Sequence, residues 1–278
     1  MLVKKYIYVF GMAILLILLI KIVHVQGSIN INGQILFNLS NSGIHEITMY
    51  DCSREEFRSI SADGLQAVWS ENNTILLNRF DSICEYNLDT NEETIIYQGE
   101  SFDFFAICKD NSISISKDNF IFLYEKESKD KKILVRDNGS QIHSWSDDGE
   151  ILYYSDVNGN IKTVNTLSGE VVDYAIGYDP IVCGTKLAYK NKDALIVKNL
   201  VTEDEYQYNG SAYSYCFSPD SDVLLVEDEI PIGIAVKNLF ANDIVLGHSI
   251  IAWDYASHKR NTLIDSCVAS PHLICDWK

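Results

Sequence analysis

Three observations along this chain of 278 residues predict its fold class, an all-β, six-bladed β-propeller preceded by one N-terminal transmembrane helix. Short apolar runs that end in an aromatic residue or a cysteine recur at intervals of 39, 37, 38 and 34 residues. A polar turn and further strand-like segments follow each run, and four strands per repeat of this length are typical of propeller blades. An uncharged stretch before the first repeat has the length of a membrane span.

The predicted membrane span, residues 6–25, starts with 15 uncharged residues, YIYVFGMAILLILLI. Lys21 interrupts it near one end, where its ammonium group can reach the membrane surface. A length of about 20 residues matches a hydrocarbon core about 30 Å thick. Lys4 and Lys5 favour a cytoplasmic N-terminus, which places the propeller on the periplasmic or other extracytoplasmic side of the cell membrane.

Two other interpretations of this stretch stay open. A signal peptide cleaved after Gly27, with Val25 two residues earlier, would also export the rest of the chain, although the small-residue pattern typical of such sites is absent. A buried helix of a cytosolic protein is the third possibility. We therefore divide the sequence into a membrane anchor or signal segment, residues 1–27, and a propeller, residues 28–278.

The charge balance of the chain restricts the classes of partner that we expect for its exported part. Lys and Arg number 22 against 39 Asp and Glu, which gives a formal net charge of −17. Such an acidic surface repels phosphate backbones, so we expect no nucleic-acid partner and favour a basic protein or peptide. Hydrophobic residues make up 47% of the chain, which excludes a disordered protein or a polytopic membrane protein.

The repeat is clearest at the end of the first strand of each predicted blade. The residues at this position are Trp69, Cys108, Trp145, Cys183 and Phe217. Clusters of Asp, Asn, Gly or Pro follow them and favour tight turns. The second strands come next, at residues 75–77, 113–115, 151–154, 187–189 and 223–226. Third and fourth strands follow at 82–88 and 94–97, 120–124 and 133–135, 160–164 and 171–172, 194–197 and 206–208, and 249–253 and 262–264.

The repeat resembles that of TolB-like, WD-related propellers, in which an aromatic-Ser-Pro-Asp-Gly turn precedes an apolar strand and a later strand ends near Asp-Leu. The segments that match best are Phe217-Ser218-Pro219-Asp220, Trp145-Ser146-Asp147-Asp148-Gly149 and Tyr86-Asn87-Leu88-Asp89. The resemblance covers about residues 30–278 and implies a propeller fold, whereas a separate helical domain like that of TolB is not visible in the sequence.

The two ends of the repeat region complement each other. Residues 34–60 offer only three strands, whereas residues 268–276 resemble a first strand and lie one repeat plus an insertion after Phe217. We therefore expect residues 268–276 to pair beside residues 34–40 and to close the ring, which removes exposed sheet edges. Six blades is the prediction, with seven blades or an evenly spaced β-sandwich as alternatives.

The seven cysteines do not predict a disulfide framework. Cys108, Cys183 and Cys275 occupy the same position in different repeats, where a thiol packs between sheets as a small hydrophobic group. Cys267 and Cys275 could pair only if the segment between them bends. Cys and His spacings typical of metal sites are absent, and no cofactor is expected.

One loop could be taken for a calcium site. Asp156, Asn158 and Asn160 alternate as oxygen-bearing residues, but Ile161 and Leu167 stand where an EF-hand loop needs Gly and Glu. An Asn-Gly pair between two strands is typical of a type I′ hairpin turn. We therefore predict a hairpin here and no metal site.

An insertion, residues 227–247, is the irregularity that suggests function. A repeat fold does not need these residues, and long insertions often lie on a binding face. Its proposed binding residues are Ile230, Ile232, Ile234, Leu239 and Phe240. The alternative is a cap or short helix that covers its own blade, and the acidic start, residues 227–229, is interpreted as a solvated turn.

The predicted function is that of a non-catalytic protein-binding module, either an envelope scaffold or an immunity-type protein. No Gly-x-Ser-x-Gly nucleophile motif is present. The alternative is a hydrolase or lyase with a carboxylate site at the central channel. Asp103, His143 and Asp179 lie at the predicted innermost strands and are the candidates for either role.

Overall fold

The computed structural model describes residues 29–278 apart from residues 30, 42–43, 72, 109–110, 140–141, 193, 230–247 and 267–271. The predicted membrane span therefore lies outside the described residues. Within the described part, no helix is long and apolar enough to cross a membrane.

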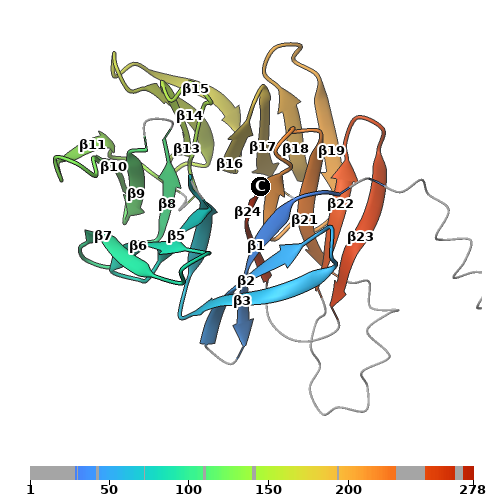
Figure 1. The fold of residues 1–278 in the computed structure, drawn as a ribbon. Coiled ribbons are helices and arrows are strands. Elements are labelled where there is room, and N and C mark those ends of the chain that lie inside the picture. Colours follow the sequence, from blue (N-terminus) through green and yellow to red (C-terminus); the bar gives the residue numbers. More distant parts are fainter. Residues whose placement is uncertain are drawn as a thin grey trace, which may run out of the picture.

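The described residues form six four-stranded antiparallel sheets arranged as blades around a common centre (Figure 1), which confirms the predicted six-bladed β-propeller. Blade 1 contains, from the centre outward, β24 (His272–Trp277), β1 (Gln34–Asn41), β2 (Ile44–Asp51) and β3 (Glu56–Ala62). Blade 2 contains β4 (Gln66–Trp69), β5 (Thr74–Asn78), β6 (Ser82–Asn87) and β7 (Glu93–Gln98). Blade 3 contains β8 (Phe104–Ile107), β9 (Ile113–Lys117), β10 (Phe120–Tyr124) and β11 (Lys131–Val135).

The other three blades repeat this order. Blade 4 contains β12 (Ser144–Trp145), β13 (Ile151–Ser155), β14 (Asn160–Asn165) and β15 (Val171–Ile176). Blade 5 contains β16 (Tyr178–Cys183), β17 (Lys186–Asn191), β18 (Ala194–Asn199) and β19 (Glu205–Asn209). Blade 6 contains β20 (Tyr215–Phe217), β21 (Val223–Glu229), β22 (His248–Asp254) and β23 (Lys259–Ser266).

The position of a strand within its blade explains its composition. The second strand is covered by neighbouring blades on both faces, so β5 (TILLN) is buried from Ile75 to Asn78. The outermost strand borders solvent, so β7 (ETIIYQ) buries only Tyr97. Each blade therefore contributes to the sequence one continuous apolar run, from its second strand, and one run that mixes polar and apolar residues, from its outermost strand.

The C-terminal strand closes the ring, as the sequence predicted. β24 pairs with β1 in antiparallel register, with Ile274 opposite Phe37 and Asp276 opposite Leu36, and Figure 1 shows the two strands side by side near the centre. The Gln34 N–H donates to the Lys278 carbonyl at 2.8 Å. Blade 1 is thus completed by segments from opposite ends of the described chain.

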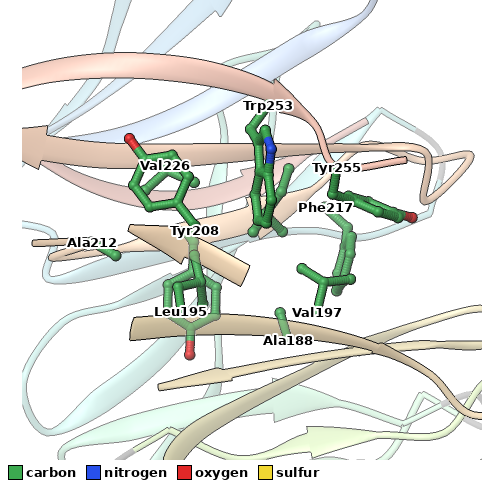
Figure 2. Close-up of a cluster of buried hydrophobic side chains, with 11 residues drawn as sticks. Ala188, Leu195, Val197, Tyr208, Ala212, Phe217, Val226, Trp253 and Tyr255 are labelled. Carbon is green, nitrogen blue, oxygen red and sulfur yellow. The ribbon is translucent and has the colours of Figure 1, made fainter. Parts of the chain in front are cut away.

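A separate apolar cluster fills each of the six spaces between blades. The cluster between blades 5 and 6 has eleven buried side chains (Figure 2). Within it the Trp253 ring centroid lies 5.2 Å from that of Tyr208 and 5.9 Å from that of Tyr255. The cluster between blades 4 and 5 has four buried side chains. Blade packing is therefore uneven around the ring.

Two of the three recurring cysteines, Cys108 and Cys183, lie between sheets, as predicted. Cys108 is buried against Trp145 of the next blade, and Cys183 packs against the cluster between blades 5 and 6. Their Sγ atoms lie 3.7 Å from the carbonyl oxygens of Gly149 and Ser218 in the following blades. Burial raises the pKa of the Cys183 thiol to about 11, so it stays neutral and unreactive at neutral pH. The side chains of Cys267 and Cys275 lie outside the described residues.

Two local predictions were wrong. The β13–β14 hairpin is not a type I′ turn, because only Gly159 of its loop has a positive φ, +77°. Instead, the Asp156 carboxylate accepts the backbone N–H groups of Asn158 and Asn160, both at 2.9 Å, and holds the loop of four residues between the two strands. The acidic residues 227–229 are not a turn either: they extend β21 and pair with β22 up to Glu229 opposite His248.

Candidate binding surfaces

The four strands of a blade return the chain to the side of the disc where the blade began, because neighbouring strands are antiparallel. One side, here called the hairpin face, therefore carries the loops between the second and third strands and the linkers between blades. The other side, here called the turn face, carries the loops that join the first strand to the second and the third to the fourth. The insertion joins β21 to β22 and so departs from the hairpin face.

The hairpin face exposes a set of large apolar side chains. They come from three hairpins, the start of β16 and the linker before β20, and are Phe80, Phe120, Val157, Tyr178 and Tyr213. Single exposed apolar residues are ordinary, whereas several on one face are typical of a protein-binding surface. The guanidinium carbon of Arg136 lies 5.9 Å from the centre of the Phe120 ring, so a cation accompanies one of the aromatic groups.

Phe80 is unusual in its backbone as well as in its exposure. It lies between β5 and β6 with φ at +68° and 48% of its surface exposed. A bulky residue in the left-handed region is strained by roughly 1–2 kcal/mol. The side chain of Asn78 holds this geometry by accepting the Phe80 N–H at 2.9 Å. Strain that presents an aromatic ring to solvent suggests a binding role.

Two of the predicted site residues lie on the hairpin face. Asp103 is exposed in the linker before β8, where its backbone N–H donates to the Ser116 carbonyl at 3.0 Å. Asp179 lies in β16 with its carboxylate 3.3 Å from the Lys190 ammonium nitrogen. Lys190 also donates to the Tyr213 carbonyl at 2.9 Å, so Asp179 belongs to a fixed ion pair beside an exposed tyrosine.

His143 lies apart from these two residues. Its side chain is 1% exposed and borders the central cavity. Its Nε2 atom is 2.7 Å from the Ser114 hydroxyl, which accepts the Trp145 indole N–H at 2.8 Å. The lining of the cavity includes neither Asp103 nor Asp179. The five proposed binding residues of the insertion lie outside the described residues.

The central cavity has a volume of about 340 Å³ and is lined by the innermost strands of all six blades. Polar side chains join these strands across blades. Gln66 bonds both backbone groups of Phe105, at 2.8 and 3.1 Å, and the Ser144 hydroxyl accepts the Val182 N–H at 3.0 Å. These contacts hold the cavity wall in place.

Asp276 of β24 is the only carboxylate among the residues that line this cavity. It accepts the backbone N–H groups of Trp69 and Trp277, both at 2.8 Å. Burial raises the pKa of Asp276, these two hydrogen bonds lower it, and the balance places it at about 6. A carboxyl group with this pKa changes its charge close to neutral pH.

No group of three or more His, Cys, Asp or Glu side chains that could hold a metal ion occurs in the part of the chain that the structure describes. Asp156, the residue that suggested a calcium loop, serves the hairpin instead. Burial opposes ionisation of its carboxyl group, but hydrogen bonds from Asn160 and Lys162 lower its pKa to about 2.

Sequence reasoning missed Phe80 and Asp276. The signal for Asp276 was present, because it follows the repeat position in the place that Ser70, Ser146 and Ser218 occupy in other blades. A carboxylate replaces a hydroxyl there. Phe80 had no comparable signal, since phenylalanine next to a turn is usually interpreted as the end of a strand.

Comparison with solved structures places this fold among known propellers. TolB from Acinetobacter baumannii superposes with a TM-score of 0.70 at 14% sequence identity, over 88% of this chain and 66% of that one. A chain of the nidogen/laminin complex gives a TM-score of 0.61 at 13% identity, over 83% and 93% of the two chains. A chain of the mitotic checkpoint complex gives 0.54 at 12% identity, over 88% and 82%.

These structures share the propeller fold with this chain, which spans about two thirds of the length of the TolB chain that it matches. No family model matches the sequence, and no curated protein matches it. The chain is therefore a six-bladed propeller whose architecture is similar to that of TolB.

Proposed function

We propose that this chain is a non-catalytic protein-binding module whose hairpin face receives the partner. The strained, exposed ring of Phe80 carries this proposal, because its conformation costs stability while 48% of its surface stays exposed. The exposed groups of the neighbouring hairpins and linkers extend the surface across blades 3 to 5. Aromatic anchors of this kind dominate the energy of protein interfaces.

The insertion belongs to the same proposed surface. It leaves β21 after Glu229 and returns at His248, at the hairpin face of blade 6. Its apolar residues Ile230, Ile232, Ile234, Leu239 and Phe240 would then add to the exposed apolar groups of blades 2 to 5. Two of the similar structures were determined as protein complexes, which supports a role of this kind for the fold.

The net charge of −17 favours a basic partner. We further propose that residues 6–25 hold the propeller at the cell membrane, with the N-terminus in the cytoplasm and the propeller on the extracytoplasmic side. An envelope scaffold and an immunity-type protein that neutralises a toxin both fit this placement. The mass of the mature chain and its digestion by protease added to intact cells test this arrangement.

The test of binding replaces residues 230–247 by Asn-Gly in the full-length chain. Because Glu229 pairs with His248, a two-residue turn closes the hairpin without changing its register. Partners are captured from native membranes with an N-terminal tag, which leaves the closing strand β24 free of additions. We expect the replacement to abolish capture of a protein that the unmodified chain retains.

The matched control lengthens a loop of the turn face by inserting Gly-Ser after Val201, which is 72% exposed. This insertion is expected to leave capture unchanged. Retention of every partner by the variant without residues 230–247 would remove the insertion from the proposal, and retention by a Phe80→Gly variant as well would overturn the hairpin face as the binding site.

A further inference from the structure

The central cavity has the dimensions and the walls of a small-ligand site. Its volume of about 340 Å³ lies within the range of small-molecule pockets, roughly 300–1,000 Å³. Aromatic residues of five blades are among those that line it: Trp69, Phe104, Trp145, Phe217 and Trp277. Such walls bury apolar ligands and attract cations that approach a ring face.

The charge in this cavity is of one sign. Asp276 is its single carboxylate, and its lining contains neither Lys nor Arg. Lys278, two residues further on, lies with its ammonium nitrogen 5.1 Å from the centre of the Trp69 ring rather than in an ion pair with Asp276. Asp147 and Asp220 act electrostatically, together with Asp276, on the Cys183 thiol at the cavity wall. A negative potential therefore extends from Asp276 toward these two residues.

The Asp276 carboxylate is stabilised only in part. Backbone N–H groups of Trp69 and Trp277 bind its two oxygens, but no cation among the described residues contributes to its pKa, which burial raises to about 6. A desolvated carboxylate gains most from a group that brings both a positive charge and hydrogen-bond donors. An anionic ligand would be repelled.

We propose that the central cavity binds a small organic ammonium ion, a primary amine on an aromatic or aliphatic body, with the Asp276 carboxylate as its counter-ion. The ammonium group donates to the Asp276 oxygens, and the apolar body packs against the aromatic wall. The ligand thus occupies the middle of the disc, whereas the protein partner occupies the hairpin face. The two proposals are independent of each other.

The test uses purified full-length protein and two probes of nearly equal shape, benzylammonium and benzyl alcohol. Calorimetry at pH 7.5 is expected to show that benzylammonium binds at least tenfold more tightly than the alcohol, because only the cation pairs with Asp276. Between pH 7.5 and pH 5 its affinity is expected to fall about tenfold, since the pKa of Asp276 is about 6 and the neutral acid lacks the charge.

Two variants identify the group responsible. Asp276→Asn is expected to lower the affinity for benzylammonium at pH 7.5 about tenfold or more and to remove most of the pH dependence of that affinity. Asp222→Asn deletes one charge from the exposed turn after β20, outside the cavity lining, and is expected to bind as the unmodified chain does. A pH dependence of binding that survives in Asp276→Asn would be assigned to the other titratable side chains of the lining, which are His143, Cys183 and Cys216.

Three results would overturn the proposal: equal affinity for the two probes, full retention of affinity by Asp276→Asn, or no binding of benzylammonium at pH 7.5. If Asp276→Asn does not fold, the affinities of the unmodified chain for the two probes are compared across pH instead. The proposal then requires the affinity for benzylammonium to fall with pH and that for benzyl alcohol, which carries no charge, to stay constant. Capture of a protein partner is measured in a separate experiment. Protein binding at the hairpin face and ammonium binding in the central cavity can therefore be contradicted independently.

Discussion

The two faces of the disc differ in how their loops are built. On the turn face, the loop between the third and fourth strands repeats around the whole ring, with a left-handed residue shortly before the fourth strand of every blade. These residues are Glu55, Asn91, Lys129, Gly169, Glu203 and His258. In five blades the loop is also capped by an Asp or Asn that accepts a backbone N–H two or three residues further on: Asp51, Asn87, Asn165, Asn199 and Asp254.

The loops of the hairpin face share no such form. They hold three residues between β5 and β6 but two between β9 and β10, and the left-handed residue is Phe80 in the first and Asp118 in the second. Several of their apolar residues, Phe80, Val157 and Tyr213 among them, face solvent. Loops that repeat thus maintain the frame of the disc, whereas loops that vary present side chains to a partner.

The largest effect should come from replacing Phe80 by Gly. Loss of an aromatic anchor is expected to lower the affinity for the captured partner tenfold or more, since interface hot spots contribute about 2 kcal/mol or more. The free energy of unfolding should stay the same or rise by up to about 1 kcal/mol, because Gly relieves the strained φ. Calorimetry with the partner and urea unfolding measure the two quantities.

The control for this variant is Leu167→Ala on the turn face, because Leu167 is 81% exposed and its side chain does not pack in the core. We expect partner affinity to remain within twofold. Equal losses from Phe80→Gly and Leu167→Ala would mean that the faces do not differ in binding.

The second effect should come from Asp156→Asn in the β13–β14 hairpin. Asp156 lies on the hairpin face, but its side chain accepts backbone N–H groups of its own loop, as the capping residues of the turn face do. Its side chain is buried and its pKa is lowered to about 2, below the usual 3.8. A lowered folded-state pKa stabilises the fold above the unfolded-state pKa, and this contribution, about 2 kcal/mol, is lost as pH falls from 4 toward 2. Urea unfolding of the unmodified chain and of Asp156→Asn should differ at pH 6 and converge near pH 2. A gap independent of pH would contradict this assignment.

A third, smaller effect should follow from removing one repeated cap. The Asn199 side chain accepts the N–H groups of Val201 and Thr202 at 3.0 and 3.3 Å. Asn199→Ala is expected to lower the free energy of unfolding by about 1 kcal/mol, whereas Asn199→Asp keeps the acceptor and most of the stability. Thermal unfolding should show a decrease of about 2–4 °C for the Ala variant alone. Partner affinity should not change in either variant.

The smallest effects test the left-handed positions themselves. Lys129→Gly should stabilise the chain by about 0.5–1 kcal/mol, because φ at Lys129 is +61°. Gly169→Ala, at the same position of the next blade with φ at +74°, should destabilise it by about 1 kcal/mol. Shifts of the same sign in the two variants would show that these loops do not share one backbone form.

The six blades and the closing strand could be predicted from the sequence because their signals are local and repeated. Tight-turn residues such as those around Trp145 and Phe217 recur at one period, and the missing strand of blade 1 was detectable by its likeness to another blade. The extent of β21 could not be predicted, because acidic residues favour turns. The Ser214 hydroxyl hydrogen-bonds the buried Glu227 carboxylate at 2.6 Å and makes a strand acceptable there.

The binding surfaces were less predictable than the fold. Asp276 acquires its environment only when six distant strands meet at the centre, so its neighbours in the sequence do not reveal it. Asp103, His143 and Asp179 were selected because all lie near innermost strands, but the start of such a strand can lie on the hairpin face or in the cavity wall. The prediction of a type I′ turn failed because the Asp156 side chain competes for the backbone N–H groups of the loop.

The most direct test of the central claim, that the hairpin face binds protein, is site-specific photocrosslinking in native cells. A photoreactive amino acid replaces Phe80 on the hairpin face in one variant and Val201 on the turn face in another, since both residues are exposed. The account predicts that position 80 gives a crosslinked protein adduct and position 201 gives none. An adduct from position 201 alone, or equal adducts from both positions, would contradict it.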